Sequence, residues 1–174
     1  MRLAPLALAA ALSLPAAFAA EMGIMETGFT DLKNAKGEAA GSAIFRPGPK
    51  GLLVRIEATG LTPGWHGIHL HEKGTCDDGG DGFKASGKHA GHGDGISHGL
   101  LNPQGPEFGD MPNIYAGADS AAHAEVFLAG ATLDALFDAD GTALIVHANE
   151  DDQTSQPIGG AGDRVACGVI QKAQ

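Results

Sequence analysis

The sequence predicts an all-β fold, namely an antiparallel Greek-key β-sandwich or flattened barrel of about eight strands with two long functional loops. Apolar and β-branched runs of about five to eight residues recur between turn signals along the chain. Amphipathic helical periodicity is scarce, whereas residues 72–111 and 148–164 are long and irregular. Short strands joined by turns and by these two loops favour a sandwich over a helical or mixed fold.

Turn sequences separate the predicted strands: NAKG at 34–37, RPGPKG at 46–51, LTPG at 61–64 and DADG at 138–141. One short helical turn is expected near residues 131–137, where Thr132 can cap it and Leu133, Leu136 and Phe137 share a face. The expected strands, in chain order, are residues 22–30, 39–46, 51–58, 65–71, 112–117, 122–128, 142–149 and 165–170.

The N-terminal sequence MRLAPLALAAALSLPAAFAA is typical of a secretory signal peptide. A basic start at Arg2 precedes an apolar run that is too short and too Ala-rich to span a bilayer stably, and small residues follow it. We expect a signal peptide of residues 1–19, cleaved after Ala19, and secretion to a bacterial periplasm. The alternative is an N-terminal membrane anchor or a buried helix. Residues 20–174 then form a single domain.

Charge and cysteine content limit the possible partners. The formal net charge is -10 and no Lys/Arg cluster is visible, so nucleic acid or an anionic membrane surface would be repelled. Cys76 and Cys167 are the only cysteines. In an exported and therefore oxidising context pairing is the default, although two free buried thiols are the alternative.

The strongest chemical signal is WHGIHLHEKGTC at residues 65–76. Side chains alternate faces along a strand, so His69 and His71 project to the same side and can share one ion. A third histidine, His147, lies in the isolated strand sequence ALIVHAN. A single buried histidine is more often a hydrogen-bonded core residue than a ligand, but three in these positions favour a metal site. Imidazole-rich coordination suits copper or zinc rather than calcium or magnesium.

Residues 88–110, KHAGHGDGISHGLLNPQGPEFGD, contain three more histidines in a segment too rich in Gly and Pro for a regular helix or central strand. This segment is either a solvent-exposed loop or a metal loop.

Together these motifs resemble the copper/zinc superoxide dismutase family in its exported bacterial form. The resemblance covers about residues 22–170 and includes, in order, His69-x-His71, GKHAG, SHG, GDMPN, IVHANEDD and GDRVACGVI. The family has a β-sandwich fold. The resemblance therefore implies an enzyme that converts superoxide to dioxygen and hydrogen peroxide by alternating Cu(II) and Cu(I), with a neighbouring zinc ion.

Position by position, the resemblance implies that His69, His71 and His147 bind copper and that His89 bridges copper and zinc. His98 and Asp110 are then zinc ligands. The remaining implied roles are anion attraction beside copper for Arg164, acceptance of hydrogen bonds from His69 and His98 for Asp151, and a disulfide between Cys76 and Cys167.

The sequence departs from the family at the zinc site. A zinc histidine usually stands three residues before the aspartate, and Glu107 occupies that position here. Glutamate ligates zinc through oxygen, so a site of two histidines, Asp110 and Glu107 is chemically reasonable. The alternative is that Glu107 faces solvent and zinc has lost a protein ligand. His92 is an additional histidine in the same loop, and we expect it to be a bystander rather than a zinc ligand.

Two further histidines have structural interpretations: His66 is expected to make hydrogen bonds and His123 to lie at the surface. Many relatives place lysines within residues 148–163, where this chain has none. We expect anion attraction to come instead from the other loop, through Lys73, Lys84 or Lys88.

The predicted function is a periplasmic superoxide dismutase with copper and zinc, acting as a monomer or homodimer without nucleic acid or membrane partners. Two other classes remain open at this point. One is a non-catalytic periplasmic copper or zinc carrier on the same fold. The other is a sandwich-based binding or adhesion module in which the histidines are structural.

Overall fold

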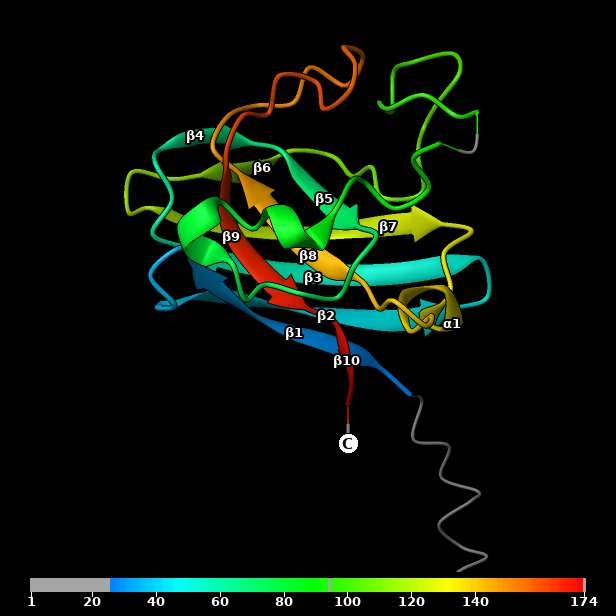
Figure 1. Ribbon diagram of the computed structural model, residues 1–174, viewed down its shortest axis with the longest axis horizontal. Coiled ribbons are helices and arrows are strands. Elements are labelled where there is room, and N and C mark those ends of the chain that lie inside the picture. The colour runs from blue at the N-terminus through cyan, green and yellow to red at the C-terminus, as the bar shows by residue number, and fades with distance from the viewer. Residues whose placement is uncertain (1–25, 94, 174) are drawn as a thin grey trace, which may run out of the picture.

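The computed structural model describes residues 26–93 and 95–173 and is dominated by strands (Figure 1). The proposed signal peptide lies outside these residues. No helix within the described ranges has the length and apolar composition needed to cross a membrane. The strands are β1 (Gly28–Asn34), β2 (Ala39–Gly48), β3 (Gly51–Thr59), β4 (Gly64–His66), β5 (Ile68–His71), β6 (Ile114–Ala116), β7 (Ala121–Ala129), β8 (Ala143–His147), β9 (Arg164–Val169) and β10 (Gln171–Lys172).

The strands form a flattened antiparallel barrel. One sheet has the order β5-β8-β9-β1-β2-β3-β7, with β10 beside β1, and a second sheet pairs β4 with β6. After the hairpin-connected strands β1-β2-β3 the chain crosses to β4 and β5, and β5 lies at the opposite end of the sheet before β7 returns to pair with β3; such long crossing connections are those of Greek-key topology. Since β6 packs against β7 and β4 leads directly into β5, the second sheet nearly closes the barrel. The predicted fold class is therefore confirmed.

Burial along the strands shows which face is the core. In β3, Leu52, Val54, Ile56 and Ala58 are buried while the residue after each of them is exposed, as expected for a strand with one solvated face. Every residue of β5 and β8 is buried instead. Both faces of these two strands must therefore be covered, one by the core and the other by loops.

The covering element is the first long loop, which contains the 3-10 turns η2 (Gly79–Asp81) and η3 (Lys84–Ser86). Figure 1 shows these turns in green, lying over β8 and β9. Phe83, between the two turns, packs against Ala143, Ile145 and Cys167 on the outer face of the sheet. The loop thereby encloses the strand face on which His69 and His71 were predicted to lie.

Two strand predictions need correction. The first strand begins at Gly28 and extends to Asn34 rather than covering residues 22–30, because the alternating buried side chains include Leu32. The predicted strand 65–71 is two strands, β4 and β5, interrupted at Gly67. A Cβ atom at Gly67 would approach the side chains of Ala161 and Asp151, so the second long loop packs closely over this break.

The predicted helical turn is confirmed as α1 (Leu133–Leu136), and its Thr132 side chain accepts a hydrogen bond from the Ala135 backbone N–H at 3.2 Å. Leu133 and Leu136 are buried and Phe137 packs beside them. α1 therefore closes one end of the barrel by packing.

Candidate metal centre

Four buried histidines meet on the outer face of β5 and β8: His69, His71, His89 and His147, here called the four-histidine cluster. His69 and His71 come from β5, His147 ends β8, and His89 comes from the first long loop, where it forms an isolated bridge with His71. One ring nitrogen from each residue lies within 4.8 Å of the others. These nitrogens are Nδ1 of His69 and Nε2 of the other three, and all four are buried without a hydrogen-bond partner.

The opposite ring nitrogen of each strand histidine faces an oxygen. Nε2 of His69 lies 2.7 Å from Oδ2 of Asp151. Nδ1 of His71 lies 3.1 Å from the Gly87 carbonyl, and Nδ1 of His147 lies 3.1 Å from the Gly162 carbonyl. Because these nitrogens donate, the inward nitrogens keep a free lone pair. The arrangement fits a soft or borderline cation with imidazole ligands, such as copper or zinc.

Burial keeps three histidines of this cluster, His69, His71 and His147, neutral at pH 7. It lowers the pKa of His69 to about 4, of His71 to about 2 and of His147 to about 3, with repulsion between neighbouring imidazolium charges adding to the effect. For His71 the positive charge of Arg164 is the second cause. Metal binding at neutral pH therefore does not have to displace protons from these rings.

A second cluster shares His89 with the first. Nδ1 of His89 lies 3.1 Å from Oε2 of Glu107 and 3.3 Å from Oδ1 of Asp110, and Nδ1 of His98 lies 2.7 Å from the same Asp110 oxygen. We call His89, His98, Glu107 and Asp110 the mixed cluster. A group of His69, His89, His98 and Asp110 also satisfies a 4.8 Å separation of ligand atoms. We favour Glu107 over His69 as the fourth member because Nε2 of His69 is hydrogen bonded to Asp151 and its Nδ1 is turned to the four-histidine cluster.

The mixed cluster is strongly acidic in character. Burial opposes a charge on His98, but hydrogen bonds to Asp110 and Asp151 outweigh it and raise the pKa of His98 to about 10. Burial likewise opposes ionisation of Asp110, yet hydrogen bonds from His89 and His98 hold its pKa well below the usual range. This concentration of negative charge needs a cation, which is a proton on His98 or a divalent metal ion.

Glu107 is not solvent exposed, because only 2% of its surface is accessible. The interpretation that it faces solvent is therefore wrong. His92, expected to be a bystander, lies outside both groups of ligand atoms but places Nδ1 at 2.7 Å from Oε1 of Glu107. Sequence reasoning missed this contact, and its only signal was a histidine three residues after His89 where a simple turn was expected.

The Asp151 carboxylate contacts one histidine of each cluster. Its Oδ2 accepts from His69 and its Oδ1 faces Nε2 of His98 at 3.1 Å and the Gln153 N–H at 2.7 Å. These hydrogen bonds hold the pKa of Asp151 below its usual range, although burial acts in the opposite direction. The carboxylate therefore fixes the ring orientation of one histidine in each cluster.

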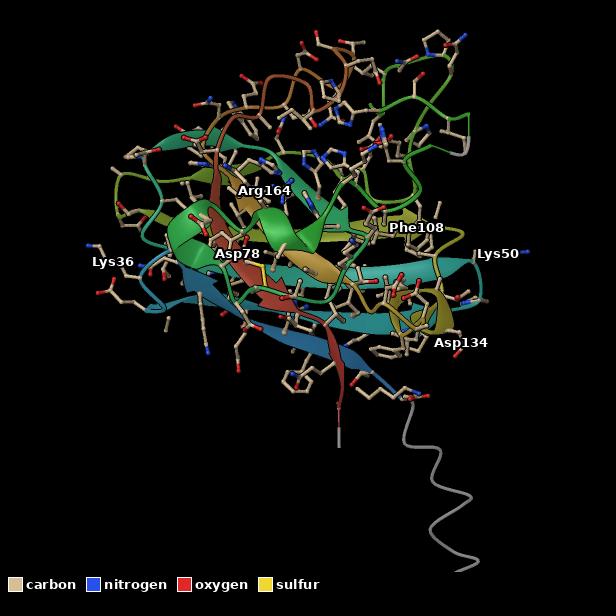
Figure 2. The ribbon with its side chains drawn as sticks, viewed as in Figure 1. Lys36, Lys50, Asp78, Phe108, Asp134 and Arg164 are labelled. Carbon is tan, nitrogen blue, oxygen red and sulfur yellow. A yellow bond between two sulfur atoms is a disulfide. The ribbon has the colours of Figure 1, made fainter. Side chains whose placement is uncertain are left out.

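Arg164 begins β9 and reaches into the first long loop, close to Asp78 in Figure 2. Its Nη1 donates to the Phe83 carbonyl and to Oγ of Ser86 at 2.6 and 2.9 Å, and its Nη2 donates to the Gly87 carbonyl at 2.8 Å. Gly87 is also the acceptor for His71. The Gly87 carbonyl therefore connects Arg164 to His71 of the four-histidine cluster. Arg164 also lines an open hollow together with Lys84.

The predicted disulfide is confirmed: Cys76 and Cys167 are bonded, with Cα atoms 5.7 Å apart. The bond ties the first long loop to β9, three residues from Arg164.

His66 also has its expected structural role, since its ring contacts the His147 and Thr62 carbonyls at 2.7 and 2.8 Å. His123 is exposed on β7, as predicted.

Comparison with known proteins identifies one family. The family model for copper/zinc superoxide dismutase matches residues 39–170. A copper-zinc superoxide dismutase of Caulobacter vibrioides is 49% identical over 146 residues, covering 80% of this chain and 83% of the relative. One from Aquifex aeolicus is 40% identical over 147 residues, covering 81% and 84%.

Solved structures agree with this result. A superoxide dismutase-like protein from Bacillus subtilis superposes with a TM-score of 0.75 at 32% identity, covering 81% of this chain and 96% of that one. The copper/zinc superoxide dismutase from Brucella abortus gives a TM-score of 0.68 at 28% identity, covering 83% and 99%.

Proposed function

Because the chain belongs to the copper/zinc superoxide dismutase family, we propose that the four-histidine cluster holds its copper and the mixed cluster its zinc. The chain is an oxidoreductase that acts on superoxide with these two metals as cofactors. The observation that supports this assignment most strongly is the set of four convergent, buried and unpartnered ring nitrogens. Unpaired buried nitrogens are costly unless a metal ion satisfies them.

In the overall reaction, two superoxide anions and two protons give dioxygen and hydrogen peroxide. Copper held by His69, His71, His89 and His147 would supply the redox chemistry, because it is stable as both Cu(II) and Cu(I). The protein must keep the ligands nearly fixed between these two oxidation states. His69, His71 and His147 meet this need because strands β5 and β8 and their oxygen partners hold each ring in place.

His89 is the residue through which the two sites communicate. Its Nε2 is turned to the four-histidine cluster and its Nδ1 to Glu107 and Asp110. When Nε2 is free of metal it can hold one of the protons that the reaction consumes. Two carboxylates, those of Glu107 and Asp110, lie beside Nδ1, where a site of three histidines and one aspartate has only one.

Arg164 is the proposed anion-attracting residue. A guanidinium keeps its charge at all physiological pH values and offers planar, directional donors. Its contacts with Phe83, Ser86 and Gly87 hold it beside His71. Lys84 lines the same hollow, as do Asp81 and Asp163. Of the three candidate lysines, Lys84 is therefore the one that we propose adds positive charge near Arg164.

We place the enzyme in the periplasm, reached by way of the signal peptide of residues 1–19. The Cys76–Cys167 disulfide supports an oxidising compartment. The single domain of residues 20–174 is proposed to act as a monomer or homodimer, without nucleic acid or membrane partners, in keeping with its net charge of -10.

Metal analysis of the purified mature protein combined with a dismutase assay tests this proposal, with Glu107→Ala and Glu107→His as variants. We expect one copper and one zinc per chain, lower zinc affinity in Glu107→Ala, and zinc retention in Glu107→His because imidazole can replace the carboxylate. Full zinc affinity in Glu107→Ala would remove Glu107 from the ligand set. Metal-loaded protein without dismutase activity would contradict the catalytic proposal.

A further inference from the structure

The two oxygens of Glu107 have different partners. Oε2 lies 3.1 Å from Nδ1 of His89, on the side of the mixed cluster, whereas Oε1 lies 2.7 Å from Nδ1 of His92. The Glu107 side chain is only 1% exposed, so water cannot solvate the outer oxygen to any useful extent. A buried carboxylate oxygen without a donor is costly. His92 supplies that donor.

Asp110 shows the same division between its two oxygens. Its Oδ2 accepts the Gly99 N–H at 2.7 Å and the Glu107 N–H at 2.9 Å. Its Oδ1 faces Nδ1 of His98 at 2.7 Å. In both carboxylates, therefore, N–H donors outside the mixed cluster's ligand atoms bond to one oxygen, and the other oxygen faces a histidine of the mixed cluster. The donors for Asp110 are main-chain groups, but the donor for Glu107 is a side chain that can be replaced by mutation.

The local backbone places His92 over Glu107. The His92 N–H donates to the His89 carbonyl at 3.1 Å, which closes a turn directly after the shared histidine. Gly91 within this turn has φ 84°, and a Cβ atom there would lie 2.9 Å from the backbone nitrogen of Phe108. The turn therefore requires glycine and lies against the residue that follows Glu107. Its position relative to Glu107 is set by main-chain packing.

We propose that His92 is a positioning residue of the zinc site: its Nδ1–H holds Oε1 of Glu107, so that Oε2 alone is presented to zinc. This inference rests on the proposed zinc site and goes beyond it by assigning a role to a residue that is not a ligand. Without the donor, the Glu107 side chain loses its fixed orientation and its outer oxygen loses its partner. Loss of such an outer partner typically lowers metal affinity about 10- to 100-fold.

The test is a zinc titration of the full mature chain, freed of metal and then made to compete with a chromophoric chelator. His92→Ala removes the donor, and His92→Asn restores an N–H close to the position of Nδ1. His123→Ala is the matched control, because it removes an exposed histidine on β7 that lies outside both clusters. We expect zinc affinity to fall about 10- to 100-fold in His92→Ala, to recover in His92→Asn, and to stay at the parent value in His123→Ala.

Cobalt(II) gives a second readout that a merely structural role would not change. Bound in place of zinc, it reports the ligand arrangement through its visible absorption bands. We expect these bands to shift in His92→Ala, as Glu107 changes its mode of binding, and to return in His92→Asn. Parent affinity and parent bands in His92→Ala would overturn the role of His92, as would an equal loss in His92→Asn.

Glu107→Ala in the same titration separates this inference from the proposed function. If Glu107→Ala loses zinc affinity and His92→Ala does not, only the role of His92 is wrong. If Glu107→Ala also keeps the parent affinity, the proposed ligand set is wrong.

Discussion

Replacing Asp151 by asparagine should weaken copper binding more than zinc binding. The carboxylate accepts three hydrogen bonds: Oδ2 from His69, and Oδ1 from His98 and the Gln153 N–H. An asparagine has one acceptor oxygen, so it keeps the most bonds when that oxygen takes the Oδ1 position. Its amide N–H₂ then faces Nε2 of His69, which must give up its proton to accept a bond. The proton moves to Nδ1 of His69, the buried, unpartnered nitrogen that we propose as the copper ligand.

The expected loss of copper affinity can be estimated from the known effect of removing one hydrogen-bond partner of a metal-binding histidine. Loss of an oriented partner behind a metal-binding histidine costs about 10- to 100-fold in affinity, which is about 1.4–2.8 kcal/mol. Separate copper and zinc competition titrations of metal-free protein measure it. Asp152→Asn is the control, because Asp152 is exposed and its carboxylate accepts only local N–H and hydroxyl groups of residues 154 and 155. Unchanged copper affinity in Asp151→Asn, or a loss confined to zinc, would refute this reasoning.

Three other perturbations have defined outcomes. Removing the disulfide by Cys76→Ser with Cys167→Ser should lower the unfolding free energy of the metal-free protein in urea by about 4–5 kcal/mol on the chain-entropy model, given the separation of 91 residues; an unchanged midpoint would contradict this. Arg164→Ala should lower the dismutation rate by on the order of tenfold at unchanged copper content, and an unchanged rate would remove Arg164 from the mechanism. Lys84→Glu should lower kcat/KM and weaken its dependence on ionic strength. The control Lys50→Glu, at the far end of the barrel in Figure 2, should have a smaller effect. Equal effects of the two variants would argue against attraction of superoxide by the charge of Lys84 itself.

Much of the fold follows from short-range sequence patterns. Alternation of apolar and polar residues locates β3 and β7, and turn sequences locate the β1–β2 and β2–β3 connections. The start of β1 was misplaced because the apolar residues before Gly28 resemble strand sequence as closely as those after it. The break at Gly67 depends on contacts with Ala161 and Asp151, which lie more than 80 residues away in the chain. No local pattern contains that information.

His69, His71 and His147 were identifiable because residue type and strand position carry the signal, whereas the roles of His89 and His98 were implied only by the resemblance to the family. The environment of Glu107 was not identifiable, since a carboxylate in a Gly- and Pro-rich loop has no periodicity that distinguishes a buried from an exposed position. Its burial and its contacts with His89 and His92 depend on how the whole loop folds back onto β5. The same is true of Gly87, whose carbonyl accepts hydrogen bonds from both His71 and Arg164.

The central claim is that two metal ions share His89, with Glu107 completing the second site. Crystals of the copper- and zinc-loaded protein, measured at the absorption edges of both metals, test it most directly. We predict a copper peak beside Nε2 of His89 and a zinc peak beside Nδ1, with Oε2 of Glu107 about 2.0–2.2 Å from zinc. A single metal peak, or a zinc ion held without Glu107, would contradict the account.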